Sequence, residues 1–151
     1  MSKQDTVLIW DVDRSPPEKS FYTIVLWRSY TKAYSSNTVS IPHLVEKNSD
    51  SLRARYLDWV YKLGEQIYKG SRIIDHLEIR ANFSYWWMTL LVEKCNYCKS
   101  PNIENIIRIF AFDQWTGKKP LKKLIYTGSN AEIVRVIKLW CKYKKVKFIW
   151  D

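Results

Sequence analysis

The C-terminal segment, residues 121–151, constrains the fold most strongly, because it predicts a β-strand, an α-helix and a second β-strand in succession. Residues 121–126 and 146–150 are short segments rich in branched aliphatic and aromatic residues, as in strands. Thr127 and Gly128 predict a turn, and Ser129 with Glu132 has the spacing of a helix capping box. This pattern predicts two parallel strands joined by a right-handed crossover. The intervening helix has one apolar face, made of Ile133, Val134, Ile137, Trp140 and Cys141.

The rest of the chain predicts further strands and helices. Residues 6–11 and 21–27 have the pattern of buried strands, whereas the polar residues 29–48 predict a loop with a short turn around Pro42. Ser49 or Asp50 is expected to cap a helix that ends near Gly70, with Leu52, Tyr56, Trp59, Val60, Leu63 and Ile67 on its apolar face. Residues 71–80 predict a strand or an extended lead-in. Residues 101–117 predict a helix with Pro at its first position. We therefore expect an α/β, Rossmann-like three-layer domain with a mainly parallel sheet.

Length and charge limit the classes of protein to consider. The 151 residues predict a single domain over residues 1–151, and the net charge of +10 favours partners that carry phosphate or another anion. The basic residues concentrate in the last quarter of the chain, and such a run is also typical of an ordinary solvated face. The chain has no N-terminal leader pattern and no long apolar run, which favours a reduced, cytoplasmic protein that could lie at the inner membrane surface.

The three cysteines predict no cofactor. Cys95 and Cys98 form one Cys-x-x-Cys pair, but the chain has no second pair, and no nearby histidine completes a zinc site. Cysteine also behaves as a small hydrophobe, so the two thiols are interpreted as apolar residues at a helix end.

Residues 82–96 predict an unusual helix that is apolar almost all the way round. At helical spacing, one narrow strip has Trp86 at its edge and contains Asn82, Thr89, Glu93 and Asn96. Two interpretations stay open. The segment could be ordinary core, with Glu93 satisfied by its neighbours. Alternatively it could line a pocket, where burial raises the pKa of Glu93 so that it acts as a base beside a sugar stacked on Trp86.

Two loops are expected at the carboxyl ends of strands, where open α/β sheets bind ligands. Asp11 and Asp13 could hold Mg²⁺, although two acids after a strand are commonly a turn. The segment from Thr127 to Asn130 could place a helix N-terminus against a phosphate. Together the two loops resemble the first two motifs of the haloacid-dehalogenase-like phosphohydrolases. That resemblance implies that Asp11 is a nucleophile and Asp13 an acid/base.

A broader resemblance covers about the C-terminal half of the chain. The run from Phe83 to Cys95, then Lys99–Pro101 and Ile106–Arg108, is similar to a bacterial family of surface carbohydrate biosynthesis proteins. So is the closing pattern from Leu124 to Trp150. The resemblance implies a glycosyltransferase of two Rossmann-like domains that builds O-antigen or capsule, in which this chain is the N-terminal, acceptor-binding half. A second domain or subunit would bind the nucleotide sugar. The chain ends on a predicted strand, which is either central in the sheet or a sign that the chain is half of a longer protein, and we favour the second.

The resemblance also implies roles for individual residues. Glu93 would be the catalytic base or an acceptor ligand. The substrate-binding residues would be Trp86, Trp87, Thr89, Lys94, Ser129 and Asn130. The ligand would be a glycan acceptor or a nucleotide sugar, with no resident cofactor.

Three functions therefore remain as hypotheses from the sequence. The first is sugar transfer in surface carbohydrate biosynthesis. The second is a basic binding module for nucleic acid or an anionic membrane surface, with nucleic acid the less expected partner. The third is a haloacid-dehalogenase-like phosphohydrolase.

Overall fold

The structure is a computed structural model that describes residues 5–17, 22–32, 37–92, 101–117 and 119–151. Contacts within the chain divide it into two compact units. Unit 1 consists of residues 1–47 and 111–151, and unit 2 consists of residues 48–110. This division leaves the prediction of one domain over residues 1–151 untested.

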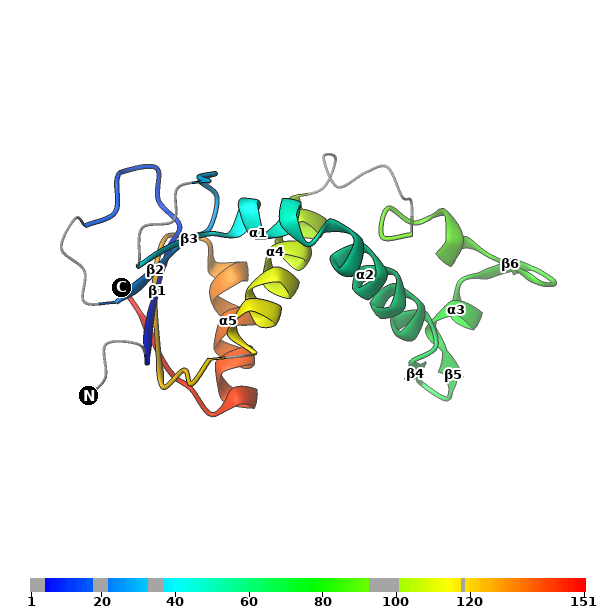
Figure 1. Ribbon diagram of the computed structural model, residues 1–151. Coiled ribbons are helices and arrows are strands. Elements are labelled where there is room, and N and C mark those ends of the chain that lie inside the picture. Colours follow the sequence, from blue (N-terminus) through cyan, green and yellow to red (C-terminus); the bar gives the residue numbers. More distant parts are fainter. Residues whose placement is uncertain (1–4, 18–21, 33–36, 93–100, 118) are drawn as a thin grey trace. The chain divides into compact units, whose positions relative to one another are not determined.

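Unit 1 is built on a five-stranded sheet, in which every strand is parallel to its neighbours (Figure 1). Along the sheet the strand order is β3-β2-β1-β8-β9. The strands are β1 (Thr6–Trp10), β2 (Thr23–Leu26), β3 (Thr38–Ser40), β8 (Lys123–Thr127) and β9 (Lys147–Trp150). Helices flank this sheet, so the prediction of a Rossmann-like α/β fold with a mainly parallel sheet is confirmed.

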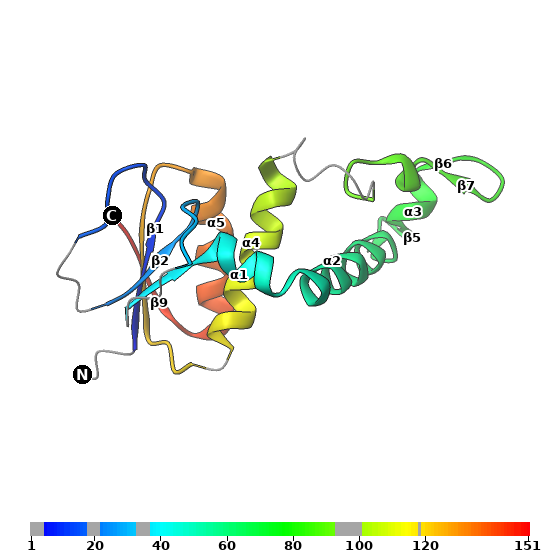
Figure 2. The same ribbon diagram turned by 45° about the horizontal axis from the view of Figure 1, so that its top comes forward.

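The two faces of the sheet are both apolar. In the register of the central strands, Val7 pairs with Leu124 and Ile9 pairs with Tyr126, and these four side chains are buried. Helix α5 (Ala131–Lys144) covers this face of the sheet on the side of β9, where Phe148 lies. Beside α5 lies the C-terminal part of α4 (Pro101–Thr116), where Phe112 packs on Trp140 (Figure 2). The opposite face holds a second cluster, formed by Leu8, Ile24 and Leu26 with Trp10 and Ile125 against them. The described residues of the β1–β2 and β2–β3 connections contain no helix.

The C-terminal βαβ unit is confirmed, with β8 and β9 parallel and α5 between them. The predicted cap was wrong by one residue. Asn130, and not Ser129, is the N-cap of α5, and its side-chain oxygen accepts hydrogen bonds from the backbone N–H groups of Glu132 and Ile133. Among the described strands, β9 pairs with β8 alone and lies at the edge of the sheet, so the alternative in which it is central was wrong.

The predicted loop over residues 29–48 was also wrong in part, because β3 and helix α1 (Ile41–Lys47) form there. Strand β3 has three residues and, within the described sheet, pairs with β2 at its edge, so its stability comes from pairing that no local pattern reveals. Pro42 lies in the first turn of α1, where the missing N–H costs nothing. The Ser40 hydroxyl accepts a hydrogen bond from the backbone N–H of His43 and satisfies one donor of that turn.

Unit 2 begins with the predicted helix, α2 (Ser49–Gly64). Its N-cap is Asn48, which makes no side-chain cap hydrogen bond, so Ser49 and Asp50 are not the cap. Ile67 lies beyond the helix in a short hairpin of β4 (Ile67–Tyr68) and β5 (Ser71–Arg72). The following elements are α3 (Ile73–His76), β6 (Glu78–Arg80) and β7 (Phe83–Ser84), before α4 begins at Pro101 as predicted. The buried core of unit 2 consists of Tyr56, Val60, Trp86 and Ile103.

The predicted aromatic helix over residues 82–96 is the largest correction. Phe83 and Ser84 form β7, and Tyr85–Met88 form one short 3₁₀ turn, η1, which ends at Thr89 in extended conformation. Aromatic side chains lose rotamer freedom in a helix, so Tyr85, Trp86 and Trp87 are weak helix formers in succession. Asn82 and Thr89 therefore do not share one face of a helix, as the predicted strip requires. Glu93 lies in residues 93–100, outside the described residues.

Candidate functional site

The strand order of unit 1 identifies where a ligand is expected. From β1 the chain continues to β2 on one side, whereas β8, on the other side of β1, continues to β9. This reversal between β1 and β8 is a topological switch point, where the loops at the carboxyl ends diverge and leave a crevice in open α/β sheets. Four strands are followed by polar residues at this edge. These residues are Asp11 after β1, Arg28 after β2, Thr127–Asn130 at the end of β8 and Asp151 after β9.

Asp11 is the buried centre of this edge. One carboxylate oxygen accepts a hydrogen bond from the Tyr126 hydroxyl at 2.5 Å, and the other accepts one from the Arg28 guanidinium. The backbone N–H of Asp11 donates to the Thr127 carbonyl at 2.9 Å. Because both carboxylate oxygens and the backbone amide are engaged, Asp11 fixes the ends of β1, β2 and β8 relative to one another.

Arg28 brings positive charge to the surface of this site. Its guanidinium also donates to the Asp11 carbonyl at 3.0 Å, so two bonds fix its direction. The hydrogen bond with the Asp11 carboxylate raises the pKa of Arg28 above its ordinary value. Its side chain is nevertheless 49% exposed. A permanently charged, oriented guanidinium with free surface is suited to a phosphate or carboxylate group on a ligand.

Gly128 allows the loops after β1 and β8 to approach each other closely. A Cβ at this position would lie 2.9 Å from the Tyr126 hydroxyl oxygen and 3.0 Å from the Asp11 Cβ. No side chain fits there without moving the buried carboxylate. Burial, with the hydrogen bond to Asp11, raises the pKa of Tyr126 well above its ordinary value, so its hydroxyl stays a donor at neutral pH.

Two indoles and a carboxylate complete the edge. The Trp150 indole N–H donates to the Gly128 carbonyl at 2.9 Å, while the side chain stays 54% exposed. The Trp10 indole N–H donates to the Arg14 carbonyl at 2.8 Å, and the Arg14 guanidinium lies 5.4 Å from the ring centroid. Asp151 accepts a long hydrogen bond of 3.5 Å from the Thr127 hydroxyl. The site therefore combines aromatic surface, a cation and hydrogen-bonding oxygens.

The structure brings together the two loops that the sequence singled out. Asp11 and Gly128 are in contact, and Asn130 caps the adjacent helix. Asp13 is exposed two residues after Asp11, and Ser129 is exposed beside the cap. Among the residues that the structure describes, no group of three or more His, Cys, Asp or Glu side chains could hold a metal ion. The carboxylate oxygens of Asp11 already have protein partners.

The other predicted site residues lie in unit 2. Trp86 is only 4% exposed and packs in the core of that unit, so the open stacking face expected of it is absent, in agreement with the core interpretation. Trp87, its neighbour, is 49% exposed. Thr89 donates its hydroxyl hydrogen bond to the Trp86 carbonyl at 2.8 Å. Glu93 and Lys94 lie outside the described residues.

Sequence reasoning missed Arg28, Tyr126 and Trp150. Ligands of open α/β sheets bind at the carboxyl ends of the strands, and this rule singled out Asp11. The same rule could have found Arg28, which follows the predicted strand 21–27, and Trp150, which ends the predicted strand 146–150. Tyr126 was assigned to a strand and its hydroxyl was not considered. Only the contact with Asp11, 115 residues away in sequence, gives it a role in the site.

Comparison with protein-family models, with curated proteins and with solved structures finds no match for this chain.

Proposed function

We propose that this chain is a sugar-transfer domain of bacterial surface carbohydrate biosynthesis, and that it binds an acceptor saccharide at the carboxyl edge of its sheet. The observation that carries the proposal is the exposed indole of Trp150, which is held over the Gly128 loop at the switch point. A fixed aromatic face beside hydrogen-bonding oxygens is the combination that suits an amphipathic ring such as a sugar.

The polar groups of the edge match the other needs of such a ligand. Asp151 and Thr127 offer oxygens to sugar hydroxyls. Arg28 offers a charged donor to a phosphate or an acidic sugar. The proposal therefore moves the acceptor site from the Trp86 segment to the ends of β8 and β9. It retains a second Rossmann-like domain or subunit as the proposed source of the nucleotide sugar.

The same geometry gives less support to the phosphohydrolase hypothesis. A nucleophilic carboxylate needs an accessible oxygen in line with the phosphorus atom. Both oxygens of Asp11 are engaged by Tyr126 and Arg28, and its side chain is 1% exposed.

The test is a binding titration of the full chain with bacterial surface oligosaccharides and, separately, with nucleotide sugars, followed by calorimetry. We expect an oligosaccharide to bind, and we expect Trp150→Phe to weaken that binding at least tenfold. Trp87→Phe is the matched control, because it removes an indole of similar exposure in unit 2. We expect it to leave the affinity unchanged.

Other outcomes would contradict the proposal in distinct ways. Loss of binding in Trp87→Phe alone would place the saccharide in unit 2, where the sequence first suggested it. No heat with any saccharide or nucleotide sugar would remove the support for sugar transfer.

A further inference from the structure

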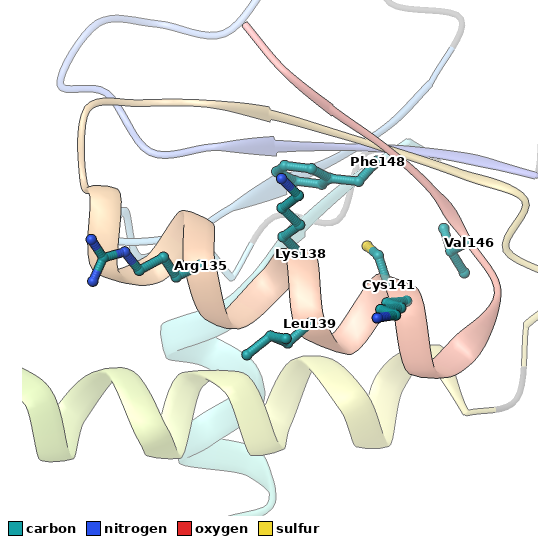
Figure 3. Close-up of a pocket in the computed structure, with 7 residues that line it drawn as sticks. Arg135, Lys138, Leu139, Cys141, Val146 and Phe148 are labelled. Carbon is teal, nitrogen blue, oxygen red and sulfur yellow. The ribbon is translucent and has the colours of Figure 1, made fainter.

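An open groove of about 590 Å³ runs between α5 and β9, away from the edge described above (Figure 3). Cys141 and Phe148 lie between the helix and the sheet, and Lys138 extends from the helix on the side of Phe148. Burial raises the pKa of the Cys141 thiol to about 12, so this residue contributes apolar surface and no reactive thiolate. The lining consists of Arg135, Lys138, Leu139, Cys141, Lys142, Val146 and Phe148.

The three basic residues of the groove form one stripe on α5. Arg135, Lys138 and Lys142 are spaced three and four residues apart, so their side chains leave the helix on the same side. Within the part of the chain that the structure describes, none of them forms an ion pair. Lys144, in the last turn of the same helix, is instead paired with Asp113 at 3.3 Å.

An exposed apolar stripe runs beside the basic one. Val136, Leu139 and Tyr143 have the same spacing, one position further round the helix. Leu139 is 67% exposed and Tyr143 is 82% exposed. The core-facing residues of α5 lie on a third side. The helix thus carries a buried face, a cationic stripe and an outward apolar stripe in that order.

We propose that this surface of α5 and β9 docks on an anionic lipid membrane. Lipid phosphates would bind Arg135, Lys138 and Lys142, while acyl chains cover Leu139 and Tyr143. Charge complementarity argues for an anionic partner, because the groove gathers three of the cations of a chain of net charge +10, and none of the three has an ion pair among the described residues. The apolar stripe argues for lipid over nucleic acid, since a phosphodiester backbone gains nothing from an exposed Leu or Val. Interfacial helices bind membranes through this pairing of basic and apolar faces.

This inference does not depend on sugar transfer. Among the described residues no helix is long and apolar enough to cross a membrane, so the contact would be with the membrane surface.

The experiment is cosedimentation of the full chain with vesicles of phosphatidylcholine alone or mixed with phosphatidylglycerol. We expect binding only to the mixed vesicles. The double variant Arg135→Gln with Lys138→Gln should bind about 25-fold more weakly, since each basic residue near an anionic surface accounts for about a fivefold change. Leu139→Ser should reduce binding about tenfold, through lost apolar burial.

The matched control is Arg53→Gln with Lys47→Gln, which removes one arginine and one lysine from exposed positions elsewhere. Circular dichroism confirms that each variant is folded. An equal loss in both double variants would overturn the proposal, because binding would then follow overall charge. Binding to an oligonucleotide that needs Arg135 and Lys138 but is unaffected by Leu139→Ser would assign the surface to nucleic acid. Absence of binding to both kinds of vesicle would also overturn it.

Discussion

At the scale of single residues, Tyr126 decides how the candidate site responds to pH. Its hydroxyl is buried and donates to the Asp11 carboxylate, and its pKa lies above that of an exposed tyrosine. A phenol that ionises less readily in the folded than in the unfolded state stabilises the fold below its unfolded pKa of about 10. That contribution is lost as the pH rises from there towards the folded pKa. The structure should therefore lose stability in alkali.

We expect Tyr126→Phe to flatten this alkaline loss. Urea unfolding at pH of about 8 and about 11 should show a large fall in the wild-type midpoint and a smaller fall in the variant. At the lower pH the variant should itself be less stable by about 1–2 kcal/mol, because Asp11 loses a buried donor. The thiol of Cys141, whose pKa is also raised by burial, adds to the alkaline loss equally in both proteins. An identical pH dependence in wild type and variant would contradict this assignment.

The site residues differ in how far the sequence could predict them. Asp11 and the Thr127–Asn130 loop were predictable, because carboxyl ends of parallel strands follow from local patterns. The partners of Asp11 were not, since Arg28 and Tyr126 reach it only through the order of strands in the sheet. The burial of Trp86 was not predictable either, because two neighbouring tryptophans in the same sequence context can differ in exposure. Trp86 packs within 2.9 Å of where a Cβ on Gly64 would lie, whereas Trp87 beside it is exposed.

At the scale of elements, strong local signals were reliable and weak ones were not. The βαβ unit was predictable because its apolar strands and amphipathic helix agree with one another. Helix α4 was predictable from Pro101 at its start. Strand β3 and the 3₁₀ turn η1 were not predictable, because each is a few residues long and depends on contacts with distant segments.

The capping of α5 is a direct test at this scale. Asn130→Ala should destabilise the protein by about 1 kcal/mol, because two backbone N–H groups of the first turn lose their acceptor. Ser129→Ala should change stability by less than about 0.5 kcal/mol, since Ser129 is exposed and is not the cap. Chemical denaturation of both variants measures the difference. A larger loss of stability in Ser129→Ala than in Asn130→Ala would instead support Ser129 as the N-cap, as the sequence predicted.

At the scale of the whole molecule, the two units have separate cores. The core of unit 2 depends on the close contact of Gly64 with the indole of Trp86, whose buried N–H has no hydrogen-bond partner among the described residues. The core of unit 1 is formed by the sheet together with Trp27, Phe112 and the inner face of α5.

This separation predicts a local response to Gly64→Ala. Ala normally stabilises a helix, but here its Cβ would lie 2.9 Å from the Trp86 Nε1, so we expect destabilisation of about 1–3 kcal/mol. Hydrogen exchange should accelerate in α2 and leave β1 and β8 unchanged. Ser49→Ala, exposed in the first turn of the same helix, is the control. Faster exchange in β1 as well would mean that the two units unfold together.

The position of β1 also has a consequence for synthesis. One edge of β1 pairs with β2, which follows closely, but the other pairs with β8, and the hydrogen bond from Tyr126 to Asp11 joins residues 115 apart. On the ribosome, β1 therefore leaves the exit tunnel long before its second neighbour has been translated. Until then it presents an open backbone edge, which nascent chains commonly shield by binding a chaperone.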